Sequence, residues 1–168
     1  MSNTQGMLYI HSVSAALCPH IEWAVNSVLD EDLKFTWGKQ PADSGMYRTA
    51  LEWRGEAGIG ALLTTSLRRM GNVRFEVTED ASKGVDAGRW SFTPNLGIFY
   101  AQTDVHGNIV VSEDRIRHAY EIGNKENDSL RVYQELSLAI GEPWDDELEP
   151  FRQAGAGAPV RWLNTQIA

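Results

Sequence analysis

One cysteine and two histidines surround a junction between an apolar run and a helical pattern near the N-terminus. Cys18, Pro19 and His20 stand at the expected helix start, and His11 lies in the preceding run. A helix N-terminus can lower the pKa of a thiol, and a nearby imidazole can activate it as a nucleophile. The two histidines and the cysteine could equally supply a Cys/His₂ metal site. With Arg48 they form a candidate ligand site; the alternative is a small buried cysteine beside two unrelated histidines, since a lone cysteine without spaced partners is a weak signal.

A second group of reactive side chains is the acidic segment near the C-terminus. Residues 142–149 hold five carboxylates and no base. Paired carboxylates can perform acid/base catalysis or bind Mg²⁺, whereas a solvated or self-packed acidic turn is the simpler interpretation. A third interpretation is a docking patch for a basic partner, because aromatic anchors beside charge are typical of interfaces. The candidate docking residues are Trp144, Asp145, Asp146, Glu147, Phe151, Arg152 and Trp162.

Other catalytic and cofactor signatures are missing from the sequence. There is no phosphate-binding loop, no HExxH, no GxSxG and no CxxC motif. We therefore expect no cofactor and assign no metal ligand. The 168 residues carry a formal net charge of −8, which argues against nucleic acid or an anionic membrane as the main partner.

The location of the protein is also predicted from composition. A single cysteine allows no internal disulfide, and the first residues lack the basic and apolar pattern of a signal peptide. No apolar run approaches the about 18 residues that a transmembrane helix needs. We therefore expect a soluble, cytoplasmic protein.

The elements that position these residues follow from hydrophobic periodicity in residues 1–79. Strands are expected at residues 7–13, 33–37, 47–54 and 73–77, and helices at 19–29 and 59–70. Apolar residues alternate in the strands and recur every three or four residues in the helices. The order β-α-β-β-α-β predicts an α+β fold with a ferredoxin-like core.

The alternation also predicts which strand residues share a face. One face, covered by both helices, would carry Leu8, Ile10, Phe35, Trp37, Leu51, Trp53, Phe75 and Val77. The other would carry Tyr9, His11, Lys34, Arg48, Glu52, Arg74 and Glu76. Because its charges are mixed, we expect this second face to be solvated or to meet a partner.

The remainder of the chain is expected to pack on the core. Residues 80–95 are predicted to form a loop in which Trp90 and Phe92 plug the second sheet face, or else bind a ligand. Residues 96–111 predict a hairpin, and two helices follow it within residues 112–140, so 80–141 form a second unit. Residues 142–168 are expected to be an acidic and aromatic tail.

Several sequence blocks resemble one family of uncharacterised cytosolic proteins from actinobacteria. These blocks are AALCPHIEWA (15–24), RFEVTED (74–80), PNLGIF (94–99), HGNIVVSEDRIR (106–117), WDDELEPFR (144–152) and GAPVRWL (157–163). The resemblance covers nearly the whole chain. It implies a cytosolic protein of that bacterial lineage and no particular activity.

Two functions are compatible with the sequence. The first is a non-enzymatic interaction protein, an accessory or regulatory subunit of a cytosolic metabolic assembly, with an acyl-CoA carboxylase as one guess at the host. The missing catalytic motifs and the aromatic-flanked acidic segment favour it. The second is a small-molecule binder or enzyme with its site at the first strand–helix junction.

Overall fold

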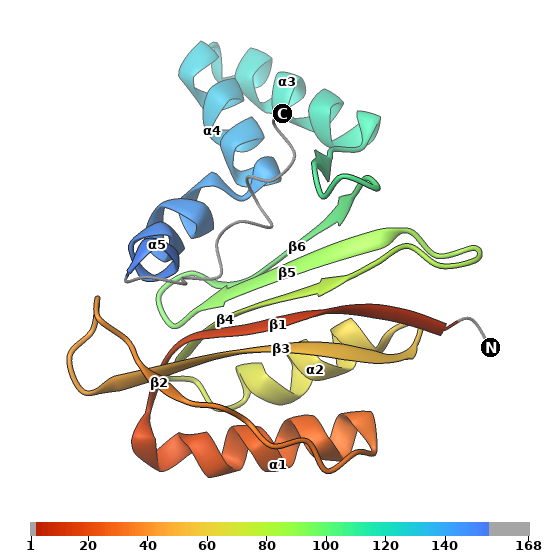
Figure 1. Ribbon diagram of the computed structural model, residues 1–168. Coiled ribbons are helices and arrows are strands. Elements are labelled where there is room, and N and C mark those ends of the chain that lie inside the picture. The colour runs from red at the N-terminus through yellow and green to blue at the C-terminus, as the bar shows by residue number, and fades with distance from the viewer. Residues whose placement is uncertain (1–2, 155–168) are drawn as a thin grey trace.

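The structure, a computed structural model, describes residues 3–154 as an α+β protein with one antiparallel sheet and helices on both sheet faces (Figure 1). The strands are β1 (Asn3–Ser14), β2 (Gly38–Lys39), β3 (Met46–Glu56), β4 (Val73–Glu79), β5 (Ala87–Thr93), β6 (Gly97–Thr103) and β7 (Ile109–Val110). The helices are α1 (Cys18–Leu29), α2 (Ile59–Arg68), α3 (Glu113–Glu126), α4 (Ser129–Ile140) and α5 (Glu142–Gln153). The strand order is β2-β3-β1-β4-β5-β6-β7.

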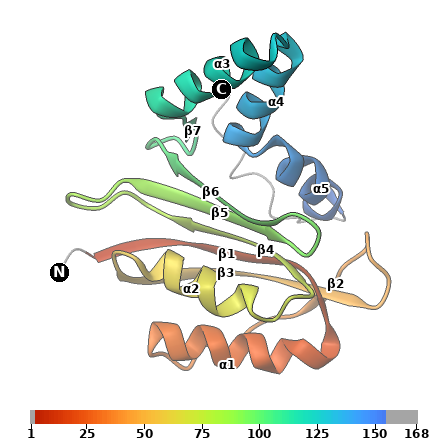
Figure 2. The same ribbon diagram turned by 180° about the vertical axis from the view of Figure 1, so that it is seen from behind.

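The main hydrophobic core lies between the sheet and helices α1 and α2. Among the side chains predicted to face the helices, Leu8, Ile10, Trp53, Phe75 and Val77 are buried in this core. Phe35, Trp37 and Leu51 pack against it while partly exposed. Figure 2 shows α1 and α2 lying together beside the β3–β1–β4 part of the sheet. The period-two pattern therefore identified the apolar face of this sheet correctly.

The second predicted strand, residues 33–37, is wrong. The structure has no strand there, and β2 consists of Gly38 and Lys39 only. The reason is that side chains of α1 hold this segment along the helix. Asn26 exchanges two hydrogen bonds with the backbone of Leu33, and Trp37 donates to Glu22 at 2.5 Å. The alternation reflects packing of Phe35 and Trp37 on the core rather than sheet pairing.

The predicted loop at residues 80–95 is wrong in its second half, where β5 joins the sheet beside β4. Trp90 and Phe92 do not plug the second face. Phe92 stacks on Phe75 in the main core with ring centroids 5.2 Å apart, and Trp90 packs against the same core. Ser91 and Arg89 face the other side and are buried as well, so β5 is covered on both faces.

The C-terminal part of the described chain is helical. Ser112 accepts a hydrogen bond from the amide of Arg115 and caps α3, as predicted. Gly141, with φ +77°, ends α4 and starts α5, where a tail was predicted instead of a helix. Figure 1 shows α5 against the sheet, while α3 and α4 form a helical hairpin beyond β6. Within residues 3–154, no helix is long and apolar enough to cross a membrane.

Candidate functional site

His11 lies at a β-bulge in β1, on the sheet face that α5 covers. The pairing of β1 with β4 shifts between Ile10 and Ser12, so that β1 carries one additional residue at this point. The additional residue lets Ile10 and Val13 both enter the main core. His11 then points to the opposite face, where it is 2% exposed. Bulges re-aim side chains in this way without ending the strand.

Glu76 of β4 is the centre of a buried polar cluster on this face. Its side chain is fully buried. The imidazole Nε2 of His11 lies 2.7 Å from one carboxylate oxygen of Glu76. The other oxygen accepts hydrogen bonds from the hydroxyl of Ser91 at 3.1 Å and from the guanidinium of Arg89 at 3.3 Å. A buried carboxylate needs such a complete set of donors to remain charged.

Arg152 contacts Glu76 more closely than Arg89 does and through two nitrogens. Its Nε donates to Glu76 at 2.9 Å, and its Nη2 donates to the second carboxylate oxygen in a fork. The same guanidinium also donates to Asp145 at 2.8 Å and to Glu149 at 3.2 Å. Arg89 donates to Asp145 as well. We call His11, Glu76, Arg89, Asp145 and Arg152 the buried ion cluster; Asp145 lies at its rim, with a side chain that is 37% exposed.

The electrostatics of the cluster favour its charged form. Burial alone would raise the pKa of Glu76, but the hydrogen bond from His11 and the charge of Arg152 outweigh it and hold this pKa well below its ordinary value. Because Glu76 is ionised, His11 must donate through Nε2. Burial and the charge of Glu76 raise the pKa of Tyr9, whose ring stacks beside His11, to about 12. The surroundings of Glu76 therefore keep this carboxylate ionised, which fits a structural role.

A second contact fixes α5 beside the cluster. The carboxylate of Glu147 accepts hydrogen bonds from the Thr93 hydroxyl at 3.0 Å and from the Asn95 amide at 3.1 Å. The guanidinium of Arg74 lies 3.4 Å from Glu147 and 4.7 Å from the ring centroid of Phe151. This contact is a combined ion pair and cation–π interaction.

The candidate docking residues are thus placed mainly on the sheet of their own chain. Trp144 donates to the carbonyl of Gly97 at 3.0 Å, and its ring packs on Phe99. Asp145, Glu147, Phe151 and Arg152 take part in the contacts described above, whereas Asp146 is exposed. Trp162 lies outside the described residues. The expectation that the second face is wet is wrong at its centre, since Tyr9, His11 and Glu76 are buried there.

The four candidate ligand residues do not form one site. Cys18 is buried in the main core, where its thiol donates to the carbonyl of Ser14 at 3.6 Å. His11 lies on the opposite sheet face, and His20 is exposed on α1. His11 and Arg48 do line one surface hollow of about 240 Å³, but Arg48 donates to the carbonyl of Ala154.

The environment of Cys18 does not activate its thiol, contrary to the possibility raised by the sequence. Burial, and then the charge of Glu22, raise the pKa of the Cys18 thiol. This is the reverse of the activation that a helix N-terminus would provide. Within the part of the chain that the structure describes, no three metal-ligating side chains are grouped together.

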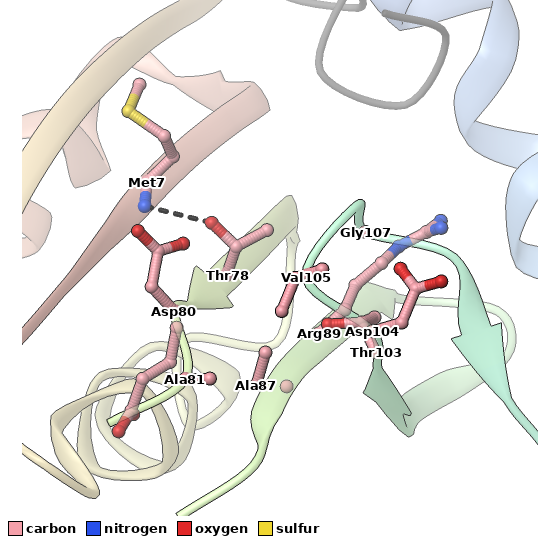
Figure 3. A pocket seen from close by; sticks show the side chains of 12 residues that line it. Met7, Thr78, Asp80, Ala81, Ala87, Arg89, Thr103, Asp104, Val105 and Gly107 are labelled. Atoms are coloured by element: carbon pink, nitrogen blue, oxygen red, sulfur yellow. Dashed lines mark hydrogen bonds between the residues drawn. The ribbon is translucent and has the colours of Figure 1, made fainter. Parts of the chain in front are cut away.

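A larger hollow of about 400 Å³ lies beside the ion cluster, at the ends of β4, β5 and β6 (Figure 3). Met7 and Thr78, joined by a 3.0 Å hydrogen bond, form one side, with Asp80 below Met7. Asp104 lies on the other side, and its carboxylate accepts hydrogen bonds from the amides of His106 and Asn108. The charged groups lining this hollow, including Arg89, Glu79 and Asp80, are already bound to other parts of the chain.

Arg152 and Asp145, predicted to face a partner, instead bind within their own chain. Glu76 and His11 share one sheet face, as alternation predicts, and form a pair that alternation does not reveal. One signal was present in the sequence. Arg152 is a lone base that follows an acidic segment, and it stands seven residues after Asp145, so on a helix the two side chains share one face. A base in such a position is suited to pair with a buried carboxylate. Arg152 and Glu76 are 76 residues apart, so no local pattern links them.

The chain is therefore an α+β protein whose last described helix is fixed to the sheet by a buried ion cluster. It belongs to the family DUF3145, described as proteins of unknown function, whose family model matches residues 7–165. Neither the curated proteins nor the solved structures gave a match to this chain.

Proposed function

We propose that this chain is a non-enzymatic interaction protein, an accessory or regulatory subunit of a cytosolic protein assembly. The observation that carries the proposal is a set of exposed apolar side chains on the α3–α4 hairpin. Ile116 and Tyr120 lie on α3, and Leu130 and Tyr133 lie on α4; we call these four residues the hairpin surface.

The hairpin surface is unusual because its largest side chains are more than half exposed. Tyr120, Leu130 and Tyr133 are 54%, 61% and 62% exposed. The two helices meet through small residues instead: Ala119 and Gly123 are buried, and Gly123 lies against Val132. Ile116 and Tyr120 are four residues apart on α3, and Leu130 and Tyr133 are three apart on α4, so each pair shares one face of its helix. Exposed aromatic and leucine side chains on a helix face are typical of interaction sites on folded proteins. These side chains are therefore available for a protein partner.

The internal contacts of α5 support placing the partner on this hairpin rather than on the acidic segment. Most of the carboxylates in α5 already bind Arg74, Arg89, Arg152 or Ser137 within the chain. A basic partner would have to replace these contacts. The hairpin surface requires no such exchange.

The identity of the assembly is a separate part of the proposal. A cytoplasmic metabolic multienzyme fits the missing catalytic motifs, and an acyl-CoA carboxylase remains one guess at the host. The actinobacterial lineage implied by the sequence blocks is where that host would be sought.

We also infer that residues 3–79 form a ferredoxin-like unit. Support comes from the strand order β2-β3-β1-β4, the antiparallel pairing of all neighbours, and the contacts of α1 and α2 with one another on one sheet face. Proteins of this class often assemble through sheet faces and edges, which agrees with an accessory role.

Affinity purification from the native cytosol tests the proposed function. The tagged wild-type chain should retain a protein partner, and the double variant Leu130→Glu/Tyr133→Glu should lose it while remaining folded. Val105→Glu is the matched control, because Val105 is also apolar and 82% exposed but lies in the β6–β7 turn. Retention of the partner by the double variant would contradict the hairpin surface.

The alternative function is tested with Cys18→Ser and His20→Ala. An interaction protein should keep its partner in both variants. A catalyst or ligand-binding protein at the first strand–helix junction should lose function while remaining folded.

A further inference from the structure

The outer edge of β6 is only partly covered by the next strand. β6 pairs with β5 along its whole length, from Gly97 to Thr103. On its other side, β7 pairs only with Gln102 and Thr103 before the chain turns away into α3. Residues 97–101 therefore form an edge of the sheet.

The backbone N–H and C=O groups that point outward from this edge can be assigned from the strand pairing. The amide of Asp104 donates to the carbonyl of Asn108 at 2.9 Å, which places residue 104 in a hydrogen-bonded pair with the β7 side. Hydrogen-bonded pairs alternate along an antiparallel ladder, so Gln102, Tyr100 and Ile98 also direct their N–H and C=O groups outward. Within residues 3–154, no hydrogen bond joins the backbone of Ile98 or Tyr100 to a group outside the β5–β6 ladder.

The side chains along the same edge are apolar and accessible. Ile98, Tyr100 and Val110 are 37%, 52% and 49% exposed. Val110 lies opposite Gln102, so it shares the sheet face of Tyr100. Tyr100 is supported by the ring of Trp90 at 4.9 Å between centroids. Figures 1 and 2 place α1 and α2 beside other strands, away from β6, and α3 and α4 beyond it. Trp144 of α5 contacts Gly97 and Phe99, so the accessible edge is centred on Ile98 and Tyr100.

A positive charge stands at one end of this edge. A hollow of about 210 Å³ between the edge and the helical hairpin is lined by Tyr100, Val110, Arg115 and Ala139, among others. Arg115 is exposed and forms no ion pair within the described part of the chain. A carboxylate entering this hollow could pair with the Arg115 guanidinium, which follows Glu113 and Asp114 in the first turn of α3 without an ion pair to either.

We propose that the β6 edge binds an extended segment of a partner protein as an additional strand. The partner strand pairs with the outward groups of Ile98 and Tyr100, lays alternate β-branched or aromatic side chains on Ile98 and Tyr100, and directs an acidic residue to Arg115. This inference rests on the proposed function, because it names the kind of segment that such an interaction protein takes. It concerns a surface separate from the hairpin surface.

Proline substitutions in the purified chain test which N–H groups of β6 point outward. Tyr100→Pro removes an outward N–H and should leave the fold intact, since proline is tolerated on edge strands where the N–H faces solvent. Ala101→Pro removes an N–H that bonds to β5 and should destabilise the protein. In the wild type, the amides of Ile98 and Tyr100 should exchange with deuterium faster than those of Phe99 and Ala101. Equal protection of all four amides would overturn the proposal.

Binding is tested by displaying random octapeptides against the purified wild-type chain. Enriched peptides should alternate apolar residues and carry an acidic residue near one end. Their affinity should fall at least about tenfold in Tyr100→Pro and in Arg115→Glu, and less in Tyr100→Thr, which keeps the N–H. Leu130→Glu/Tyr133→Glu should leave peptide binding unchanged.

Strand addition would also be overturned by the absence of any enriched peptide, by equal affinity for Tyr100→Pro, or by a dimer of this chain that forms through β6 and blocks the edge. Each is measured on the purified chain without the native partner. A chain that still captures its partner from the cytosol would then keep the proposed function while losing strand addition.

Discussion

Arg152 of α5 donates hydrogen bonds to Glu76 of β4 through two guanidinium nitrogens, and its Nε lies 2.9 Å from the carboxylate. Glu76 is 0% exposed and Arg152 is 1% exposed, so water screens little of their interaction. The pair lies on the sheet face opposite the main core and connects the last described helix to the middle of the sheet. Together with the contacts of Glu147 and Trp144, this pair holds the acidic segment as a helix against its own chain.

Breaking this pair should cost much more stability than breaking an exposed one. Arg152→Met leaves Glu76 buried with a reduced set of donors, and we expect a loss of about 3–5 kcal/mol in the free energy of unfolding. Arg54→Met is the control, because Arg54 pairs with Glu52 at 3.2 Å on the surface and should cost less than about 1 kcal/mol. Urea denaturation measures both values, and equal losses would contradict the account.

Stability should also depend on pH through Glu76. The unfolded carboxyl has its ordinary pKa of 4.5, whereas the folded one has a pKa well below it. The resulting stabilisation is fully present above the unfolded pKa and is lost as the pH falls through 4.5 toward the folded pKa. Glu76→Gln should be less stable at neutral pH and should have a flatter stability curve on the acid side. Glu52→Gln serves as an exposed control, and an unchanged slope in Glu76→Gln would contradict this assignment.

The junction between α4 and α5 should tolerate no side chain at Gly141. This residue has φ +77°, and a Cβ there would lie 2.6 Å from the ring of Phe99. Gly71 has a similar φ of +71°, but a Cβ there would meet nothing within 4 Å. Gly71→Ala therefore reports backbone strain alone, at about 1 kcal/mol. Gly141→Ala should cost clearly more in thermal unfolding, and equal shifts would show that Phe99 does not constrain the junction.

Cys18 should behave as an unreactive thiol. Because burial and Glu22 raise its pKa, little thiolate is present near neutral pH. We expect labelling by a chromogenic disulfide at pH 8 to be at least about tenfold slower in the native chain than in denaturant. Labelling of the native protein at the same rate as in denaturant would show that the Cys18 thiol is reactive and would contradict this prediction.

Local patterns predicted most of the helices and the central strands. Alternation in β1, β3 and β4 and the caps at Ser112 and Gly141 depend on neighbours close in sequence, so they can be read without the fold. The prediction of a strand at residues 33–37 failed because Asn26 and Glu22 of α1 hydrogen-bond to this segment. Alternation cannot reveal such contacts. The strand β5 was not predicted because the residues before it are rich in glycine and aspartate, which are typical of turns.

The candidate site was harder to predict because its residues come from distant segments. His11, Glu76, Arg89 and Arg152 come from three strands and a helix and are joined only when the sheet forms. Alternation placed His11 and Glu76 on one face, but mixed charge on a face fits a wet surface as well as a buried cluster. The bulge at His11 changes the register and has no clear signature in the sequence.

Native mass spectrometry of the tagged chain, purified mildly from its native cytosol, tests the proposed accessory role most directly. The account predicts a stoichiometric complex with a heavier protein, which is absent when Leu130→Glu/Tyr133→Glu is purified in the same way. A lone chain, or a chain carrying only a mass of metal or metabolite size, would contradict the account and favour a ligand-binding function.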